Sequence, residues 1–170
     1  MRTEFLIAVI YCILMRFVEL YVSRRNEADA IRNGGHRVKP DATGALVTVH
    51  TLWFVGMIAE ELFLGPQPWA RALLMGFGLL AVLAEVLRIT CMLTLGKRWN
   101  VAVVIRPTAP LVRKGIYSWL THPNYVAVCV LLVALPLALG LPFTAAAIVP
   151  LKAWALRKRL AIENVALAQA

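Results

Sequence analysis

Four residues that stand together at the start of an apolar run, His122, Pro123, Asn124 and Tyr125, are of types that could do chemistry. Pro123 suits the first position of a helix, with Thr121 or His122 as the capping residue before it. Main-chain N–H groups at the start of a helix carry partial positive charge and bind carboxylates, here beside an imidazole and an amide. The stretch therefore predicts a helix whose first turn binds an anionic group.

A second group of polar residues lies near the carboxyl-terminal end, in ALRKRLAIENVALAQA. Arg159 and Glu163 are four residues apart, so they share one face of a helix, and Asn164 follows them. The same spacing is equally typical of a solvated amphipathic tail, and nothing in it places either residue beside His122. The two stretches predict a polar pocket between a long loop, a helix start and the final helix, but they do not name a reaction.

The loop that leads to His122 is rich in ring-bearing and turn-forming residues. It runs from Thr94 to Tyr125 and includes Trp99, Asn100, Gly115, Tyr117 and Trp119. The alternating stretch VAVVI, Val101 to Ile105, predicts a short strand or extended segment within it. An ordinary connection between membrane helices does not need so many rings, so the loop is expected to contribute to the pocket.

The elements that must position these residues are membrane helices. Of the 170 residues, 61% are hydrophobic and 16% are charged, whereas soluble domains are roughly 45–50% apolar. Spanning a bilayer takes roughly 20 mostly apolar residues in a helix. The composition predicts an all-α integral membrane protein of one domain, 1–170, with about five transmembrane helices. The five apolar runs are Phe5 to Tyr21, Ala45 to Leu64, Ala70 to Leu95, Tyr125 to Leu139, and Phe143 to Leu156, the last two joined by a tight LGLP hairpin.

The charges between these runs predict how the chain is oriented. Basic residues gather after the first run, in the loop from Gly96 to Thr121 and in the tail, whereas the connection after the second run carries Glu60, Glu61 and only Arg71. The positive-inside rule then places the N-terminus outside and the C-terminus inside. The net charge of +9 is explained by this topology and by anionic membrane lipids, without nucleic acid as a partner.

Several polar residues lie within the apolar runs, where burial makes them informative. Arg16 and Glu19 are three apart, as are Glu85 and Arg88, and each pair is expected to form a structural ion pair. His50 is expected to be a core histidine with its hydrogen bonds satisfied. The three cysteines are scattered through the apolar runs without metal-ligand spacing, which predicts no metal site.

Four motifs in order, LGKRWN, PLVRKGIYSWLTHPNY, a proline-ended apolar run and RLAIEN, resemble the isoprenylcysteine carboxyl methyltransferase family over about the last 80 residues. The stretches ELYVSRRNEADAIRNGG and HTLWFVGMIAEE resemble a small bacterial branch of it, some members of which are associated with type III polyketide synthases. The resemblance implies an S-adenosylmethionine-dependent O-methyltransferase of the bacterial inner membrane. It implies a lipidic acceptor, either a prenylcysteine carboxylate or an alkylpyrone or alkylresorcinol hydroxyl.

The resemblance also implies roles for single residues. It assigns residues 1–69 to two leading helices and residues 70–170 to the half of the domain that binds the cofactor. It makes Arg159 the catalytic candidate, near the transferred methyl group. Cofactor contacts are assigned to Trp99, Asn100, Val112, Gly115, Tyr117, His122, Asn124, Tyr125 and Glu163.

Three positions depart from the family pattern. Thr121 stands where the family usually has Arg, and Leu131 stands where it often has Glu. Where the family has two acidic residues in the tail, this chain has Glu163 followed by Asn164. Leu131 is expected to face a lipid-borne acceptor, in an apolar groove between the third and fourth helices, with Arg159 as the one strong charge near the transferred methyl. A carboxylate acceptor and a phenol or enol acceptor both remain open.

Two other functions fit parts of the sequence. The stretch HPNY is shared with membrane sterol and steroid reductases, so an NADPH-dependent reductase is the alternative enzyme. The chain is short for one and has no second basic cluster for a 2′-phosphate. A non-catalytic scaffold for a partner synthase is the third hypothesis, and Thr121 and Leu131 favour it.

Overall fold

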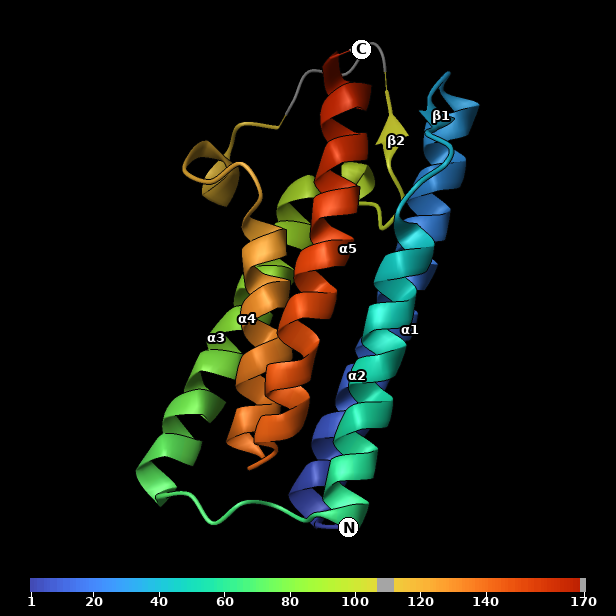
Figure 1. Ribbon diagram of the computed structural model, residues 1–170. Coiled ribbons are helices and arrows are strands. Elements are labelled where there is room, and N and C mark those ends of the chain that lie inside the picture. Colours follow the sequence, from blue (N-terminus) through green and yellow to red (C-terminus); the bar gives the residue numbers. More distant parts are fainter. Residues whose placement is uncertain (107–111, 169–170) are drawn as a thin grey trace.

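The computed structural model describes residues 1–106 and 112–168, with side chains described to residue 166. Five α-helices run up and down in one bundle, so that the two termini lie at opposite ends of the molecule (Figure 1). The helices are α1 (Thr3–Arg32), α2 (Thr43–Phe63), α3 (Arg71–Leu95), α4 (Pro123–Ala138) and α5 (Pro142–Ala168). The described part of the chain is therefore helical almost throughout, as the composition predicts.

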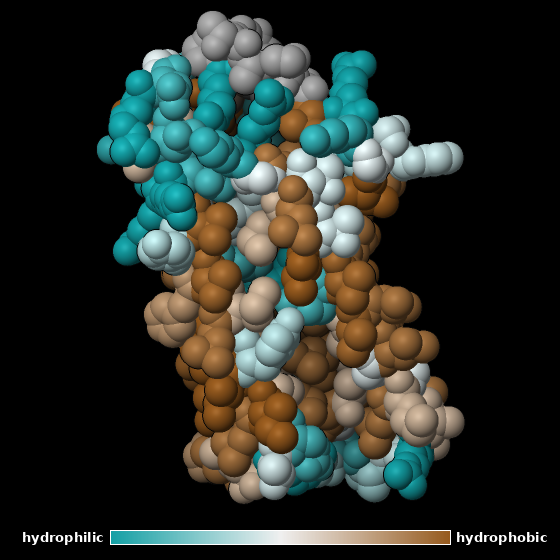
Figure 2. Space-filling model, turned by 180° about the vertical axis from the view of Figure 1, so that it is seen from behind, coloured by the Kyte–Doolittle hydropathy of each residue, from teal (hydrophilic) through white to brown (hydrophobic). Residues whose placement is uncertain are grey.

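Three of these helices are long and apolar enough to cross a membrane: Thr3–Arg32, Thr43–Phe63 and Arg71–Arg98. The helix α4 is equally apolar but only 16 residues long, and α5 carries Lys152 and Arg157 to Arg159 within its length. Figure 2 shows a broad apolar band with hydrophilic surface at both ends. The chain is an integral membrane protein, and crossing of the membrane by α4 and α5 stays a prediction.

Two helices are longer than their apolar runs. The sequence predicts a basic loop after Tyr21, but α1 continues to Arg32 because residues 22–32 contain good helix formers and break only at Asn33. Gly34 has a φ of 80°, and the N–H groups of Gly34 and Gly35 donate to the carbonyls of Ile31 and Ala30, which is a Schellman ending. The helix α5 likewise continues to Ala168.

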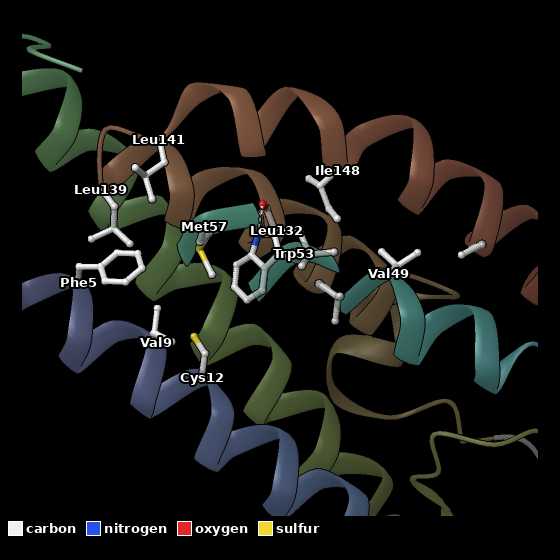
Figure 3. Close-up of a cluster of buried hydrophobic side chains, with 12 residues drawn as sticks. Phe5, Val9, Cys12, Val49, Trp53, Met57, Leu132, Leu139, Leu141 and Ile148 are labelled. Carbon is white, nitrogen blue, oxygen red and sulfur yellow. Dashed lines mark hydrogen bonds between the residues drawn. The ribbon is translucent and has the colours of Figure 1, made fainter. Parts of the chain in front are cut away.

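The apolar core joins α1, α2, α4 and α5. Figure 3 shows Trp53 and Met57 of α2 between Phe5, Val9 and Cys12 of α1 and Leu132 of α4. The indole N–H of Trp53 donates to the main-chain oxygen of Leu132 at 2.9 Å. This bond satisfies the polar atom of a fully buried ring, so it fixes the register of α2 against α4.

The hairpin between α4 and α5 is tight, as the LGLP stretch predicts. Gly140 adopts a φ of 75°, and the N–H of Leu141 donates to the oxygen of Pro136 at 2.8 Å. The carboxylate of Glu60 on α2 accepts hydrogen bonds from the N–H groups of Phe143 and Thr144, at 3.0 and 2.6 Å. A negative charge at these free N–H groups stabilises the start of α5.

The two ion pairs predicted inside the membrane form one network between α1 and α3. Arg88 bonds Glu85 through two nitrogens at 2.9 and 2.6 Å, and its third nitrogen contacts Glu19 at 2.5 Å. Glu19 also pairs with Arg16 at 2.7 Å. The prediction of structural ion pairs is confirmed, and the network explains how α1 and α3 hold their charges together inside an apolar bundle.

The end of the bundle that carries the C-terminus is tied together by short elements. The strands β1 (His36–Arg37) and β2 (Val104–Ile105) pair antiparallel, which confirms the extended segment predicted there. The side chain of Asn26 on α1 donates to the main-chain oxygens of Gly96 and Trp99. These bonds explain why α1 extends beyond its apolar run, since its last turns hold the loop after α3.

A second polar cluster connects β1 to the start of α2. The carboxylate of Asp41 accepts hydrogen bonds from the Nε of Arg37 at 2.9 Å, and from the hydroxyl and N–H of Thr43 at 2.9 and 3.3 Å. Burial raises the pKa of this carboxyl, but the bonds from Thr43 and Arg37 outweigh it and lower the pKa below its usual value. Asp41 therefore anchors the connection while it is ionised.

Candidate functional site

The first turn of α4 places His122 and Tyr125 side by side. The helix begins at Pro123, as predicted, with His122 in the capping position but without a capping hydrogen bond from its side chain. The His122 ring instead stacks on Tyr125, with centroids 5.1 Å apart and an interplanar angle of 15°. The N–H groups of Tyr125 and Val126 both donate to the oxygen of His122. Fewer N–H groups are thus available to a ligand than the sequence predicts.

Tyr125 joins the two charged residues of the tail. Its hydroxyl donates to Oε2 of Glu163 at 2.5 Å and accepts from Nε of Arg159 at 3.1 Å. Arg159 Nε is 3.8 Å from the same carboxylate oxygen. Arg159 is 5% exposed, and Asn164 on the same helix is exposed. The structure therefore rejects the solvated tail for Arg159 and Glu163, and brings both residues to the start of α4.

Two buried polar atoms in this part of the bundle have no partner among the described residues: Nη1 of Arg159 and, in the first turn of α4, Oδ1 of Asn124. A buried polar atom without a hydrogen bond costs about 1–3 kcal/mol. Oε1 of Glu163 also accepts no hydrogen bond within the described residues. The Nη1 of Arg159 can donate to a bound molecule, and the oxygens of Asn124 and Glu163 can accept from one.

The loop before α4 folds against the end of α3. Gly115, with a φ of 56°, begins the 3₁₀-helix η2 (Gly115–Ser118) and follows the half-buried Val112 and the exposed Lys114. Tyr117 in η2 is hydrogen-bonded to Cys91, and its burial, with the nearby charges of Tyr125 and Glu163, raises its pKa. The hydrogen bond with Cys91 therefore holds Tyr117 against the end of α3.

Trp99 and Asn100 lie on the other side of this loop, next to α1. Trp99 is 4% exposed and ends the 3₁₀-helix η1 (Gly96–Arg98), where Asn26 holds its main-chain oxygen at 2.7 Å. Neither residue has a hydrogen bond or ring contact with Tyr125, Arg159 or Glu163 in the part of the chain that the structure describes. The structure thus groups His122, Tyr125, Arg159 and Glu163 directly, and leaves Trp99 and Asn100 at the edge of the site.

A groove between α4 and α5 leads away from the cluster. It has a volume of about 380 Å³ and is lined by His122, Tyr125, Val126, Cys129, Val130, Leu156 and Leu160. Leu131 does not line this groove, because small residues such as Ala81 and Ala84 let α3 pack closely on α4 around it. Leu131 is buried in that contact, 4% exposed, so it faces α3 and not the groove.

Two further buried polar residues differ from what the sequence predicts. Lys152 is 6% exposed in the apolar part of α5, about two helical turns before Arg159. His50 bonds Leu46 through Nδ1 at 2.7 Å, but its buried Nε2 has no partner among the described residues, so it is only half satisfied. The signal for the burial of Lys152 was its spacing, since it stands seven positions before Arg159, on the same face of α5.

A second groove, of about 460 Å³, lies between α2 and α5. Its lining includes Trp53, Phe63, Phe143 and Leu151, most of them toward the end of the bundle that carries the N-terminus, so it is separate from the cluster at Tyr125. Among the described residues, no group of three or more histidine, cysteine, aspartate or glutamate side chains could hold a metal ion.

These features define a helical integral membrane protein. Its polar site, with some hydrogen-bonding atoms unpartnered among the described residues, lies where the start of α4 meets the carboxyl-terminal part of α5. The sequence model of the isoprenylcysteine carboxyl methyltransferase (ICMT) family matches residues 74–169, which span α3 to α5. The chain belongs to this family, and the membership indicates a membrane methyltransferase. A protein of Bacillus subtilis, described as "Uncharacterized protein YpbQ", is 32% identical over 132 residues, which are 78% of this chain and 76% of that protein. No solved structure matches the chain.

Proposed function

We propose that the chain is an S-adenosylmethionine-dependent O-methyltransferase that acts on a lipidic acceptor at the membrane. The observation that carries the proposal is the convergence of Tyr125, Arg159 and Glu163 beside unpartnered polar atoms, within the segment that matches a methyltransferase family. A cofactor with an ammonium, a carboxylate, a ribose and an adenine needs acids, cations, amides and aromatic walls. The cluster contains all four kinds of group.

Each residue has a distinct part in this proposal. Glu163, with Oε1 free, would hold the ammonium group of the cofactor, and His122 would hold its carboxylate together with the N–H of Asn124. The side-chain oxygen of Asn124 accepts a hydrogen bond from a ribose hydroxyl or the adenine amine. Tyr125 fixes the carboxylate of Glu163 and the guanidinium of Arg159 relative to each other. Asn100, Val112, Gly115 and Tyr117, with Trp99, would form the outer wall.

When bound, this cofactor supplies an electrophilic methyl group. Arg159 is the candidate catalytic residue, because its Nη1 is buried and unpartnered and can donate to an acceptor oxygen that carries negative charge. The apolar groove between α4 and α5 holds the alkyl or prenyl chain, each buried methylene contributing roughly 0.8 kcal/mol. Catalysis then comes mainly from alignment of the reacting atoms and exclusion of water.

The proposal includes the orientation of the chain in an inner membrane. The end of the bundle that carries the cluster also carries exposed basic residues, among them Arg24, Arg25, Lys39, Lys114 and Lys158. The positive-inside rule places that end in the cytoplasm, where the cofactor is made. Five antiparallel helices then leave the N-terminus outside. A functional link to a type III polyketide synthase would make the acceptor an alkylpyrone or alkylresorcinol.

Transfer of a labelled methyl group from S-adenosylmethionine to a panel of acceptors tests the proposal. The panel contains a prenylcysteine, an alkylresorcinol, an alkylpyrone and a free fatty acid, each offered to the detergent-solubilised protein. Labelling of one of them is expected, with its loss in Glu163→Ala. Labelling of none, in a protein that binds S-adenosylhomocysteine, would contradict the lipidic acceptor. Binding of NADPH instead would favour the reductase, and binding of neither would favour the scaffold.

A further inference from the structure

The segment that precedes α4, residues 113–121, exposes two large apolar side chains at a hydrophilic end of the bundle. Trp119 is 86% exposed and Leu120 is 43% exposed. Arg113 and Lys114, at the start of the same segment, are exposed as well, and the segment contains no acidic residue. This segment, the aromatic loop, therefore combines basic and apolar side chains that the described part of the chain leaves uncovered.

The middle of the aromatic loop is fastened to the last turns of α3. Gly115 lies against the side chain of Thr94, and the side chain of Tyr117 is hydrogen-bonded to Cys91. Figure 1 shows this segment, in gold before α4, beside the ends of α3 and α4 and on the side of the bundle away from α1 and α2. The loop is thus held at the side of the bundle, at the height of the last turns of α3.

The length of α3 places this height at the edge of the hydrocarbon layer. The helix begins at the exposed Arg71, a charge that marks the opposite membrane surface, and Cys91 stands 20 positions after it. At 1.5 Å per residue these two residues are about 30 Å apart along the helix axis, which is about the thickness of the hydrocarbon core. A loop bonded to Cys91 therefore lies where hydrocarbon meets the headgroups, the level at which tryptophan is enriched in membrane proteins.

The polar groups of the aromatic loop are paired in a way that suits this level. The N–H groups of Tyr117, Trp119 and Leu120 all donate to main-chain oxygens inside the loop. The hydroxyl of Ser118 also donates to a main-chain oxygen of the loop, at 2.7 Å. Polar groups that leave water without a partner cost free energy, so these internal bonds let the loop approach the hydrocarbon at little cost.

We propose that the aromatic loop docks into the surface of an anionic phospholipid bilayer. Trp119 and Leu120 enter the boundary between headgroups and hydrocarbon, and Arg113 and Lys114 bind the lipid phosphates, because basic residues beside apolar ones fit anionic headgroups above an apolar layer. The loop leads into His122, which lines the groove between α4 and α5, so docking holds this wall of the groove at the bilayer surface. The inference goes beyond the proposed function and applies to either orientation of the chain.

Quenching of Trp119 fluorescence by brominated lipids tests the docking. The emission of Trp119 is the difference between the wild type and Trp119→Phe, both in nanodiscs that contain phosphatidylglycerol. Lipids brominated near the headgroup end of the acyl chain should remove most of this emission, and iodide in the water should remove little. Trp99 lies at the same end of the bundle but is 4% exposed, so the emission lost in Trp99→Phe is the control and should be insensitive to both quenchers.

The basic residues are tested with the double variant Arg113→Gln and Lys114→Gln. It should lower the ratio of docked to undocked loop about fivefold for each charge, or about 1 kcal/mol, seen as weaker quenching of Trp119 by brominated lipid and stronger quenching by iodide. High salt should act on the wild type in the same direction. The double variant Arg24→Gln and Lys39→Gln, which removes two exposed charges outside the loop, is the matched control and should behave as the wild type.

Emission of Trp119 that iodide quenches and brominated lipids do not would overturn the proposal and leave the loop to a protein partner. Lipid quenching that is equal in neutral and anionic nanodiscs, and unchanged in the Arg113 and Lys114 variant, would overturn the role of the basic residues. No cofactor or acceptor is used, so the result is independent of whether the chain is a methyltransferase. Thermal unfolding of each variant separates loss of docking from loss of the fold.

Discussion

Replacement of Arg159 by lysine should abolish most of the turnover and leave the cofactor site nearly intact. Arg159 is 5% exposed, its Nε donates to Tyr125 at 3.1 Å and its Nη1 is free to donate to an acceptor. Lysine keeps the positive charge but not the planar fork, so it cannot hold Tyr125 and the acceptor oxygen together. Loss of one donor to a developing oxyanion lowers kcat about 10²–10³-fold, or about 2.7–4 kcal/mol.

The assay is methyl transfer from labelled cofactor, in parallel with calorimetry of S-adenosylhomocysteine binding. Tyr125 and Glu163 stay bonded in Arg159→Lys, so affinity should fall by at most about threefold, far less than the loss in turnover. Arg157→Lys, an exposed position on the same helix, is the control and should be fully active. Normal turnover in Arg159→Lys, or an equal loss of affinity and turnover, would refute the role given to Arg159.

Two further predictions concern the stability of the fold, and a third concerns the orientation of the chain in the membrane. Arg88→Met leaves Glu19 and Glu85 with an uncompensated charge in the bundle, so unfolding in mixed micelles should show a loss of about 3–5 kcal/mol; a loss below about 1 kcal/mol would show that the network is not structural. The pKa of Asp41 is lower in the folded protein than in the unfolded chain, where it is about 3.9. The ionised carboxylate of Asp41 therefore stabilises the fold at pH values above about 3.9, and this stabilisation is lost as the pH falls through the pKa of the folded protein. Asp41→Asn keeps an oxygen for Thr43 but loses the ion pair with Arg37, so it should cost up to about 1 kcal/mol at pH 7 and nothing at the acid end of a pH series of thermal unfolding. A pH-independent cost would contradict the linkage. A reporter fused after Ala170 should be active in the cytoplasm, and activity only outside would reverse the proposed orientation.

The sequence predicts the helices well because each apolar run must be buried or lipid-facing and must satisfy its own backbone. It does not predict that α1 and α5 continue through polar residues. Their last turns are stabilised by contacts distant in sequence, such as the bonds of Asn26 to the loop after α3. Composition alone cannot show such contacts.

The candidate site shows the same limit. Spacing places Arg159 and Glu163 on one face, but only the antiparallel packing of α4 and α5 brings that face to Tyr125. Leu131 faces α3 because small residues of that helix admit it, a consequence of packing that no local pattern contains. The burial of Lys152 could be predicted, because it lies within an apolar run and stands seven positions before Arg159, on the same helix face.

The central claim is that the polar cluster at the start of α4 binds S-adenosylmethionine, and binding of its demethylated product tests it most directly. Calorimetry of S-adenosylhomocysteine on the detergent-solubilised protein should show one site per chain. Glu163→Ala and His122→Ala should each weaken binding about tenfold or more, while Asn164→Ala, exposed beside Glu163, should match the wild type. Wild-type affinity in both Glu163→Ala and His122→Ala, in folded protein, would contradict the account, and so would tight binding of NADPH in place of S-adenosylhomocysteine.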